Sequence, residues 1–328
     1  MSVNKNNQKI EKLTKGLIGL LAYNILLPYN VTSYGAGVVV DPSALEAHRA
    51  TIGKTANGLD QIDIVAPNNN GLSHNKFQEF NVDKRGMILN NSAEMTLTRL
   101  AGLVYGNNNL TKGNEAKTIL SEVTGIKRSE IEGFIEVAGK ETEFILANPN
   151  GIYLSSGGFL NMSKTTLTTG NSQINSDGSL GFRIKDGIVE IAKGATINIE
   201  DVDYFEILSR AAKIGGVLSS SRTENRSTKE LKILTGDNTY NYDTGKYTSE
   251  DSEGKYGYAI DATEFGAVSA GKISLISTDK GVGVNSFSSM IATVGNLDID
   301  SKGDIKVKNV VTRKGDIVMK SSEGNVKQ

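Results

Sequence analysis

The chain contains no cysteine and no tryptophan, and only four prolines and two histidines occur among its 328 residues. Without cysteine, the chain can form no disulfide, offers no thiolate to a zinc ion and has no cysteine nucleophile. His48 lies in a polar segment without a partner motif, and we interpret His74, beside Asn75, as a structural or exposed loop residue. These absences argue against a metalloenzyme or a cysteine hydrolase.

The charges of the chain nearly cancel, with 36 Lys and Arg against 37 Asp and Glu and a net charge of -1. A balanced chain has no basic footprint for nucleic acid or for an anionic membrane. The glycine clusters at residues 35–37 and 281–284 complete neither a G-x-G-x-x-G fingerprint nor a phosphate-binding loop. We therefore expect no nucleic acid and no nucleotide among the partners.

The first 35 residues differ in character from the rest of the chain. Residues 1–11 are polar, and Lys12 and Lys15 precede an apolar run over residues 16–27 that ends at Pro28. The run is shorter than the ~20 apolar residues that span a bilayer, and small residues follow it at positions 33–36. We predict a secretory signal segment over residues 1–35; a buried amphipathic helix or an uncleaved anchor is the alternative.

Short strands are predicted through the remaining chain. Its 36 glycines and its many Asn, Ser and Thr residues suit strands separated by tight turns. Alternating or β-branched apolar residues predict strands at residues 38–40, 59–65, 77–82, 86–89, 142–147, 152–154, 187–191, 195–199 and 204–208. The tyrosine-rich polar stretch 219–258 is interpreted as a long hairpin or exposed excursion.

Two helical elements are also predicted. Residues 115–123 place apolar side chains at helical spacing, ending before Gly125, and are interpreted as a cap or crossover. A second helical turn is predicted at Ser129, because Glu132 follows it at capping-box spacing.

A repeated pattern marks the C-terminal part. Segments that begin at Gly271, Gly295, Gly303 and Gly315 share the form Gly-x-apolar-x-apolar-x-polar, and Gly295 and Gly315 are 20 residues apart. A short strand, a glycine corner and this period are typical of a parallel β-helix, in which each coil buries its apolar face against the next. We predict an all-β, right-handed parallel β-helix, a single-stranded solenoid with an N-terminal cap, a short helix and extra-helical hairpins.

No active site follows from these patterns. Asp298 and Asp300 share one face of a predicted strand, and such carboxylates can bind Ca²⁺, but we interpret them as part of a solvated outer face. The Ca²⁺-binding G-G-x-G-x-D repeat does not occur. We expect no catalytic residue, no cofactor and no metal site. A β-helical polysaccharide lyase or hydrolase is the alternative function, and it needs clustered Asp, Arg or Lys on one face of the coil.

The segment Asn148, Pro149, Asn150, Gly151 and Ile152 separates two of the predicted strands. Pro149 fixes its own φ, and Asn150 and Gly151 tolerate the positive φ of a tight reversal. Asparagine side chains at such turns bond nearby backbone groups. We predict that this turn joins two buried layers, follows the helical crossover and fixes the start of the regular coils.

Three stretches, in order, resemble the two-partner secretion (TPS) or haemagglutination activity domain of filamentous-haemagglutinin-like exoproteins. They are SHNKFQEFNV with GMILNNS at residues 73–92, ILSEVTG with FIEVAG at 119–139, and ANPNGI with GFLN and LTTG at 147–170. The resemblance covers about residues 37–240. Where the family often has Asn-Pro-Asn-Leu, this chain has Asn107, Asn108, Asn109 and Leu110. Some relatives carry a cysteine pair in the loop after the turn that corresponds to residues 148–152, and this chain has no cysteine there.

The resemblance implies a secretion-targeting domain of a large exported adhesin. It implies recognition by a cognate outer-membrane β-barrel transporter through periplasmic recognition domains, and β-helix folding at the cell surface of a Gram-negative bacterium. Adhesion to host-cell or bacterial surface receptors, or delivery of a C-terminal toxin in contact-dependent inhibition, would be the role of the whole protein. Residues 107–110 and 148–152 would form the transporter-recognition and folding motif. A stand-alone exported binding protein is a further alternative.

The resemblance and the repeats together divide the chain into three parts. Residues 1–35 are the signal segment, residues 36–260 the secretion domain, and residues 261–328 the start of a repetitive β-helical passenger. Because the repeat pattern runs to Gln328 without a capping segment, we expect the chain to be the front part of a longer protein.

Overall fold

The computed structural model describes residues 37–220, 228–262 and 266–328, and Gly37–Gln328 forms one compact unit. The predicted signal segment, residues 1–35, lies outside the described residues. Within those residues, no helix is long and apolar enough to cross a membrane.

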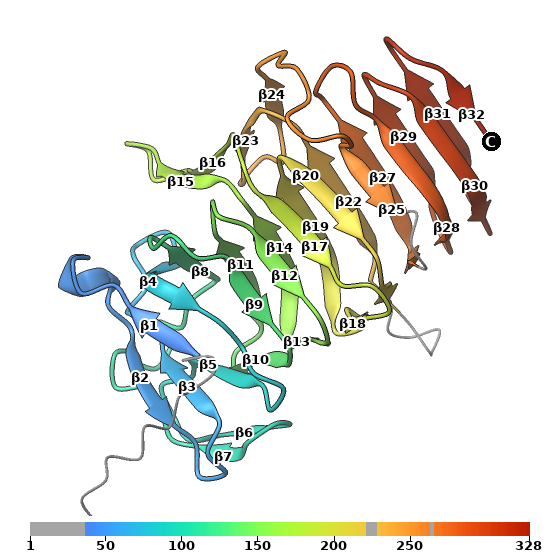
Figure 1. Ribbon diagram of the computed structural model, residues 1–328. Helices are drawn as coiled ribbons and strands as arrows, with labels where there is room; N and C mark the ends of the chain where they lie inside the picture. The colour runs from blue at the N-terminus through green and yellow to red at the C-terminus, as the bar shows by residue number, and fades with distance from the viewer. Residues whose placement is uncertain (1–36, 221–227, 263–265) are drawn as a thin grey trace, which may run out of the picture. The chain divides into compact units, whose positions relative to one another are not determined.

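The chain winds as a solenoid whose coils stack side by side from β1 to β32 (Figure 1). One long sheet, sheet A, has ten strands, and all its pairings from β4 onward are parallel. In spatial order its strands are β1 (Val38–Val40), β4 (Leu72–Phe80), β8 (Thr118–Val123), β11 (Thr142–Ala147), β14 (Met162–Thr168), β19 (Val202–Ser209), β22 (Glu230–Thr235), β27 (Lys272–Ser277), β29 (Leu297–Ser301) and β31 (Ile317–Ser321).

A second sheet, sheet B, forms the other walls of the solenoid. It has two rows of strands that meet at the long strand β28 (Val284–Ala292), which is followed by β30 (Ile305–Thr312) and β32 (Val326–Lys327). One row holds β2 (Thr51–Lys54), β3 (Asp60–Asp63), β5 (Met87–Asn91), β10 (Phe134–Gly139), β13 (Gly157–Leu160), β18 (Thr196–Asn198), β21 (Val217–Ser219) and β26 (Ala267–Ala270). The other holds β9 (Ser129–Ile131), β12 (Ile152–Leu154), β17 (Ile188–Ile191), β20 (Ala211–Ile214) and β25 (Ile260–Ala262). The predicted parallel β-helix is confirmed.

The core lies inside the coils and is rich in aromatic and β-branched side chains. Phe80, Phe144, Phe159 and Phe205 lie on β4, β11, β13 and β19, and neighbouring ring centroids in this series are 6.4, 6.4 and 5.6 Å apart. Aromatic pairs at such distances add to the burial of apolar area. Each coil therefore closes the core of the coil before it, as expected for a repeat architecture.

The strands that follow the repeated glycines stack in register in sheet A. Gly271, Gly295 and Gly315 precede β27, β29 and β31, whose residues Ile273, Leu297 and Ile317 are in register. A Cβ at Gly315 would lie 2.3 Å from the carbonyl oxygen of Gly295, so the corners stack too closely for a side chain. Gly303 differs, because it precedes β30 of sheet B.

Two hairpins leave the solenoid and build a four-stranded antiparallel sheet on the outside of sheet A (Figure 1). Its strands, in order, are β15 (Asn171–Ile174), β16 (Leu180–Ile184), β23 (Asn238–Asn241) and β24 (Tyr247–Ser249). Its inner face buries Phe182, Tyr240 and Tyr242 against Leu120 and Ile145 of sheet A. The predicted extra-helical hairpins are confirmed, and Tyr240 pairs with Tyr247 across strands.

The helix predicted over residues 115–123 is wrong. Residues Thr118–Val123 form β8, which pairs in parallel with β4 and β11. Ile119 and Val123 face the inner core, whereas Leu120 faces the extra-helical sheet. Because both faces of this strand are buried, its apolar residues mimic helical spacing.

Other expectations also need correction. Ser129 begins β9 rather than a helical turn, and the one helical element among the described residues is the short 3-10 helix η1 (Glu46–His48). The stretch 219–258 is an excursion only in part, because Glu230–Thr235 is β22 of sheet A. Its outward lysine and glutamate side chains gave it a loop-like composition, while Leu231 and Ile233 point into the core.

Candidate functional site

The turn at residues 148–152 connects β11 of sheet A to β12 of sheet B, so the prediction that it joins two buried layers is confirmed. The amide of Gly151 donates to the carbonyl of Asn148 at 3.0 Å, and the amide of Asn150 donates to Oδ1 of Asn148 at 2.9 Å. Gly151 has a φ of 110°, a conformation that side chains disfavour. In the sequence Asn-x-Asn-Gly, the first asparagine thus accepts the bonds that close the turn, and the glycine adopts the positive φ.

The side chains of both asparagines tie this turn to the preceding coil. Nδ2 of Asn148, which is fully buried, donates to the carbonyl of Lys127 and to Oγ of Ser129, both at 3.0 Å. Nδ2 of Asn150 donates to the carbonyl of Gly125 at 2.8 Å. Buried amides with satisfied bonds rigidify a corner, whereas unsatisfied ones are costly.

The turn does not mark the start of the coils, which corrects that prediction. β4 and β8 already pair in parallel upstream, with Leu72 opposite Thr118. The turn instead lies inside the stack: the amide of Asn148 donates to Thr168 O of the next coil at 2.9 Å, and Ile152 pairs with both Ser129 and Val189.

The turn at Asn107–Leu110 has the same hydrogen-bonding pattern. The amide of Asn109 donates to Oδ1 of Asn107 at 2.8 Å, and the amide of Leu110 donates to the carbonyl of Asn107 at 3.1 Å. Nδ2 of the buried Asn107 donates to Ile64 O and Asn90 O at 2.9 and 3.0 Å. Asn108 occupies the position of the family's proline and is exposed, so its identity leaves the internal bonds of the turn intact.

A third turn of this type, at Asn68–Gly71, was not predicted from the sequence. The amide of Asn70 donates to Oδ1 of Asn68 at 2.9 Å, and the amide of Gly71 donates to Asn68 O at 2.8 Å. The signal was present, because Asn68, Asn69, Asn70 and Gly71 repeat the Asn-x-Asn-Gly form. Here the asparagines are exposed, so the motif fixes a turn but its burial depends on the neighbouring coil.

The histidines lie together, which the sequence did not indicate. His74 is buried in β4, not in a loop, and its Nε2 lies 2.7 Å from Oε2 of Glu122. Ser172 of the extra-helical sheet donates to Oε1 of Glu122 at 2.8 Å, and His48 packs its ring on His74 at 4.6 Å between centroids. Burial opposes ionisation of Glu122, but the hydrogen bonds from His74 and Ser172 hold its pKa below the ordinary value. This cluster joins β4, β8 and β15.

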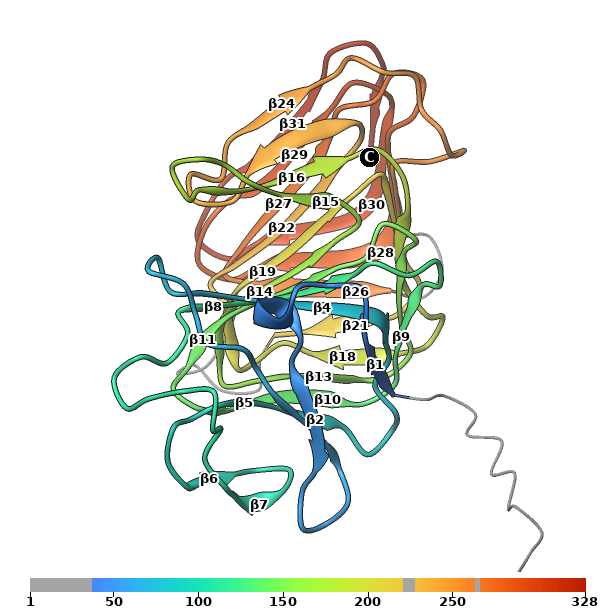
Figure 2. The same cartoon turned by 90° about the vertical axis from the view of Figure 1, so that its left-hand side faces the viewer.

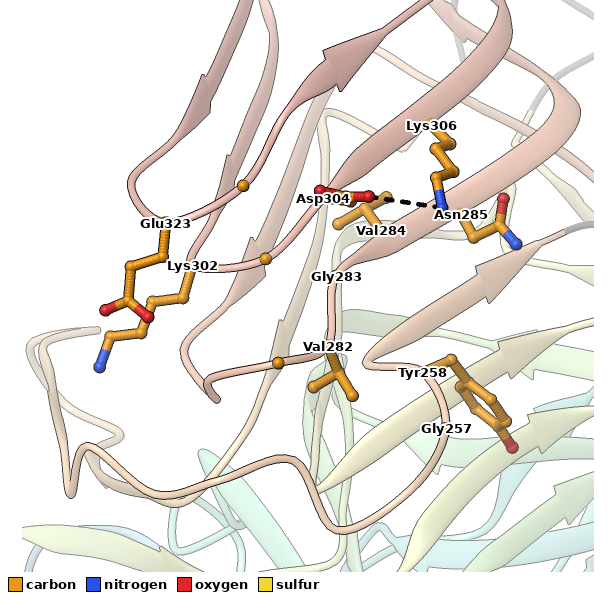
Figure 3. A pocket seen from close by; sticks show the side chains of 13 residues that line it. Gly257, Tyr258, Val282, Gly283, Val284, Asn285, Lys302, Asp304, Lys306 and Glu323 are labelled. Carbon is orange, nitrogen blue, oxygen red and sulfur yellow. Dashed lines mark ion pairs between the residues drawn. The ribbon is translucent and has the colours of Figure 1, made fainter.

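A polar pocket of about 360 Å³ opens at one corner of the C-terminal coils (Figure 3). Tyr258, Asn285 and Lys302 line it, and Asp304 and Lys306 form an ion pair of 3.4 Å within it. The amide of Asn325 donates to Asp304 at 2.9 Å, and this bond lowers the pKa of Asp304.

Metal-ligating side chains do not gather into a site among residues 37–220, 228–262 and 266–328. No cluster of three His, Cys, Asp or Glu side chains in these ranges is placed to hold a metal ion. Asp298 and Asp300 point outward from β29, as predicted. Leu297 and Ile299, which alternate with them along the strand, face the core.

These features define a class: a parallel β-helical solenoid with an extra-helical sheet and with corners fixed by buried asparagines. The family profile of the TPS secretion domain matches residues 36–307, and the chain belongs to this family. It is a secretion-targeting domain, and membership implies export together with a cognate outer-membrane transporter.

Similarity to individual proteins agrees with the family assignment. The toxin CdiA of Escherichia coli is 37% identical over 291 residues, which is 87% of this chain and 9% of that protein. Filamentous hemagglutinin of Bordetella pertussis is 34% identical over 271 residues, 81% of this chain and 7% of that protein. The chain therefore spans less than a tenth of the length of these relatives.

The crystal structure of the filamentous hemagglutinin secretion domain superposes with a TM-score of 0.71 at 32% identity. The match covers 89% of this chain and all of that structure. The family resemblance stated from sequence and the β-helical fold are thus confirmed.

Proposed function

We propose that the periplasmic recognition domains of the cognate transporter read the region around the turns Asn107–Leu110 and Asn148–Ile152, and that the same turns direct folding of the β-helix at the cell surface. The observation that carries this proposal is the set of bonds by which buried Asn148 joins its own corner to Lys127 and Ser129 of the preceding coil. Exposed Asn150 and Asn108 present these corners to a partner.

The bonding of Asn148 gives folding a direction. Its side chain needs the corner at 127–129, and its backbone amide needs Thr168 of the following coil. A coil that forms after its predecessor finds the partners of the Asn148 side chain already in place, and the backbone amide of Asn148 is paired when the next coil is added. A coil formed alone leaves both groups unsatisfied. Export from the N-terminal end, one coil at a time, agrees with this order.

The test is secretion of the chain with and without the co-expressed transporter. The wild-type chain should reach the cell surface or medium only with the transporter. Asn148→Ala and Asn150→Ala should block export while periplasmic synthesis stays nearly unchanged. Asn70→Ala is the control matched to Asn150→Ala, because Asn70 holds the same position in an Asn-x-Asn-Gly turn outside the two proposed turns, and it should be exported normally. Normal surface export of the 148 and 150 variants would contradict the proposal.

We further propose that residues 1–35 act as the signal segment, that residues 36–260 form the recognised domain and that residues 261–328 begin the passenger. The change from coils that carry extra-helical hairpins to plain coils after β26 supports the second boundary. Adhesion to host or bacterial receptors, or delivery of a C-terminal toxin, belongs to the whole protein; the name of the CdiA relative supports the toxin role.

A further inference from the structure

The polar pocket in the C-terminal coils is built by the corners that precede β25, β28, β30 and β32, which are neighbours in sheet B. In Figures 1 and 2, β28 and β30 lie side by side, far from the hairpin of β6 (Thr96–Thr98) and β7 (Gly102–Val104), which leads to the turn at Asn107–Leu110. These corners come together only in the folded β-helix, and membership of the family implies export. A ligand of this pocket is therefore one that the folded chain meets after export.

Glycines leave the corners of the pocket bare. An added Cβ at Gly283 would lie 1.9 Å from Asp304 O, and one at Gly303 would lie 2.3 Å from Val282 O. The backbones stack too closely at these positions for any side chain. The hollow is thus built into the stacking of the coils, and ligand pockets are usually preformed in this way.

The charges around the pocket cancel. Lys302 and Lys306 line it together with two acidic residues, Asp304 and Glu323. Figure 3 shows Lys302 and Glu323 on one side of the pocket and Lys306 on the other. Lys306 pairs with Asp304 at 3.4 Å, and Lys302 pairs with Asp251. Because neither sign of charge is in excess, the pocket suits a neutral ligand better than an anion or a cation.

The hydrogen-bonding groups of the pocket are of both kinds. The ammonium group of Lys306 only donates, the ionised carboxylate of Asp304 only accepts, and the amide of Asn285 does both. A hydroxyl group is at once a donor and an acceptor, so it bridges neighbouring groups such as Asp304 and Lys306. The half-buried Tyr258 adds an aromatic ring, on which the C–H face of a sugar ring stacks by dispersion and by attraction to the negative face of the π-system.

We propose that this pocket binds a neutral saccharide, one or two sugar rings at a time. Its volume of about 360 Å³ lies at the small end of the range for ligand pockets, ~300–1,000 Å³. A saccharide presents many hydroxyls and a C–H face within such a volume. A peptide of the same size carries one amide per residue, and its apolar side chains would lie against charged groups.

The test begins with binding of the fluorescently labelled chain to an array of neutral glycans. Calorimetric titration with a soluble disaccharide of the strongest binder should then give a Kd of ~1 mM or tighter. Inorganic phosphate and tetra-alanine, titrated in the same way, should not bind. Their failure would distinguish a saccharide site from an anion site and from a peptide groove.

Two substitutions locate the site. Tyr258→Ala and Lys306→Ala should each raise Kd about tenfold or more, because each removes a side chain that lines the pocket. Tyr256→Ala and Lys308→Ala are the matched controls: Tyr256 precedes the pocket in the same corner, Lys308 is exposed on β30 like Lys306, and neither lines the pocket. Both controls should keep the wild-type Kd.

Absence of binding to every neutral glycan would overturn the inference. Binding of phosphate or tetra-alanine that competes with the glycan would also overturn it and identify a different ligand class. A glycan that the Tyr258 and Lys306 variants bind with the wild-type Kd would occupy another surface, which is a third contradicting result. Each of these outcomes leaves the proposed recognition by the transporter intact, because the secretion assay measures it separately.

Discussion

Arg210 and Asp279 form a buried ion pair, with Nε of Arg210 lying 2.6 Å from Oδ2 of Asp279 and side chains that are 7% and 2% exposed. Arg210 also contacts Asp237 at 3.2 Å, at the base of the extra-helical sheet. The pair therefore links the corner after β19 to the corner after β27, across the coil that lies between them.

Removal of one partner should be strongly destabilising. Arg210→Ala leaves Asp279 buried without its counter-charge, and breaking a buried pair in this way costs about 3–5 kcal/mol. Lys229→Ala is the comparison, because the pair of Lys229 with Asp203 is exposed and such pairs contribute below ~1 kcal/mol. Urea denaturation of both variants measures the difference; equal losses would show that the buried network contributes no more than a surface pair.

The His74–Glu122 cluster should make stability depend on pH. The pKa of folded Glu122 is lowered from 4.5, so its contribution is present above pH 4.5 and is lost as the pH falls through the lower folded value. Protonation removes the charge that faces His74 and Lys76. The melting temperature of Glu122→Gln should lie below that of the wild type at pH 6, and the gap should narrow below pH ~4. A constant gap across this range would contradict the assignment.

Asn148→Ala should lower the free energy of unfolding by about 1–3 kcal/mol, because it leaves buried polar partners at Lys127 and Ser129 without donors. Asn68→Ala, at the equivalent first position of a turn whose asparagines are exposed, should cause a smaller loss. Chemical denaturation of the two variants side by side checks this prediction. Similar effects would mean that burial of the amide does not matter.

Gly151→Ala should destabilise the corner for two reasons: its φ is 110°, and a Cβ would lie 3.0 Å from Ile188 O of a neighbouring coil. Gly194→Ala measures the effect of the positive φ alone, because Gly194 has a φ of 74° but no heavy atom within 4 Å of an added Cβ. We expect ~1 kcal/mol at Gly194 and a larger loss at Gly151. A smaller loss at Gly151 would exclude the close approach as a cause.

The sequence predicted the strands of the solenoid well where one face is buried and the other is not. β27 and β29 alternate strictly between core-facing and outward residues, and the glycines predicted as corners, Gly271 and Gly295, precede them. β11 and β12 were also correctly bounded, because the Asn-Pro-Asn-Gly turn separates them sharply.

The helix wrongly predicted over residues 115–123 has its physical origin in the extra-helical sheet. That sheet covers the outer face of β8, so Leu120 and Ile119 are both buried and the alternation that identifies a strand disappears. The bonds of the turn at residues 148–152 were equally hidden, since Nδ2 of Asn148 and its partner Ser129 are 19 residues apart. Such pairings depend on the length of each coil, which local patterns do not encode.

The pairing of β16 with β23 has a consequence for how the solenoid comes apart. In a simple repeat array each coil contacts only its neighbours, and the ends can fray one coil at a time. Here Phe182 and Tyr240 are opposite each other, although β19 and its coil lie between the two hairpins along the chain. The coils from β14 to β22 are thus coupled beyond nearest neighbours, and their backbone amides should exchange hydrogen as one cooperative block while the coils after β27 open singly.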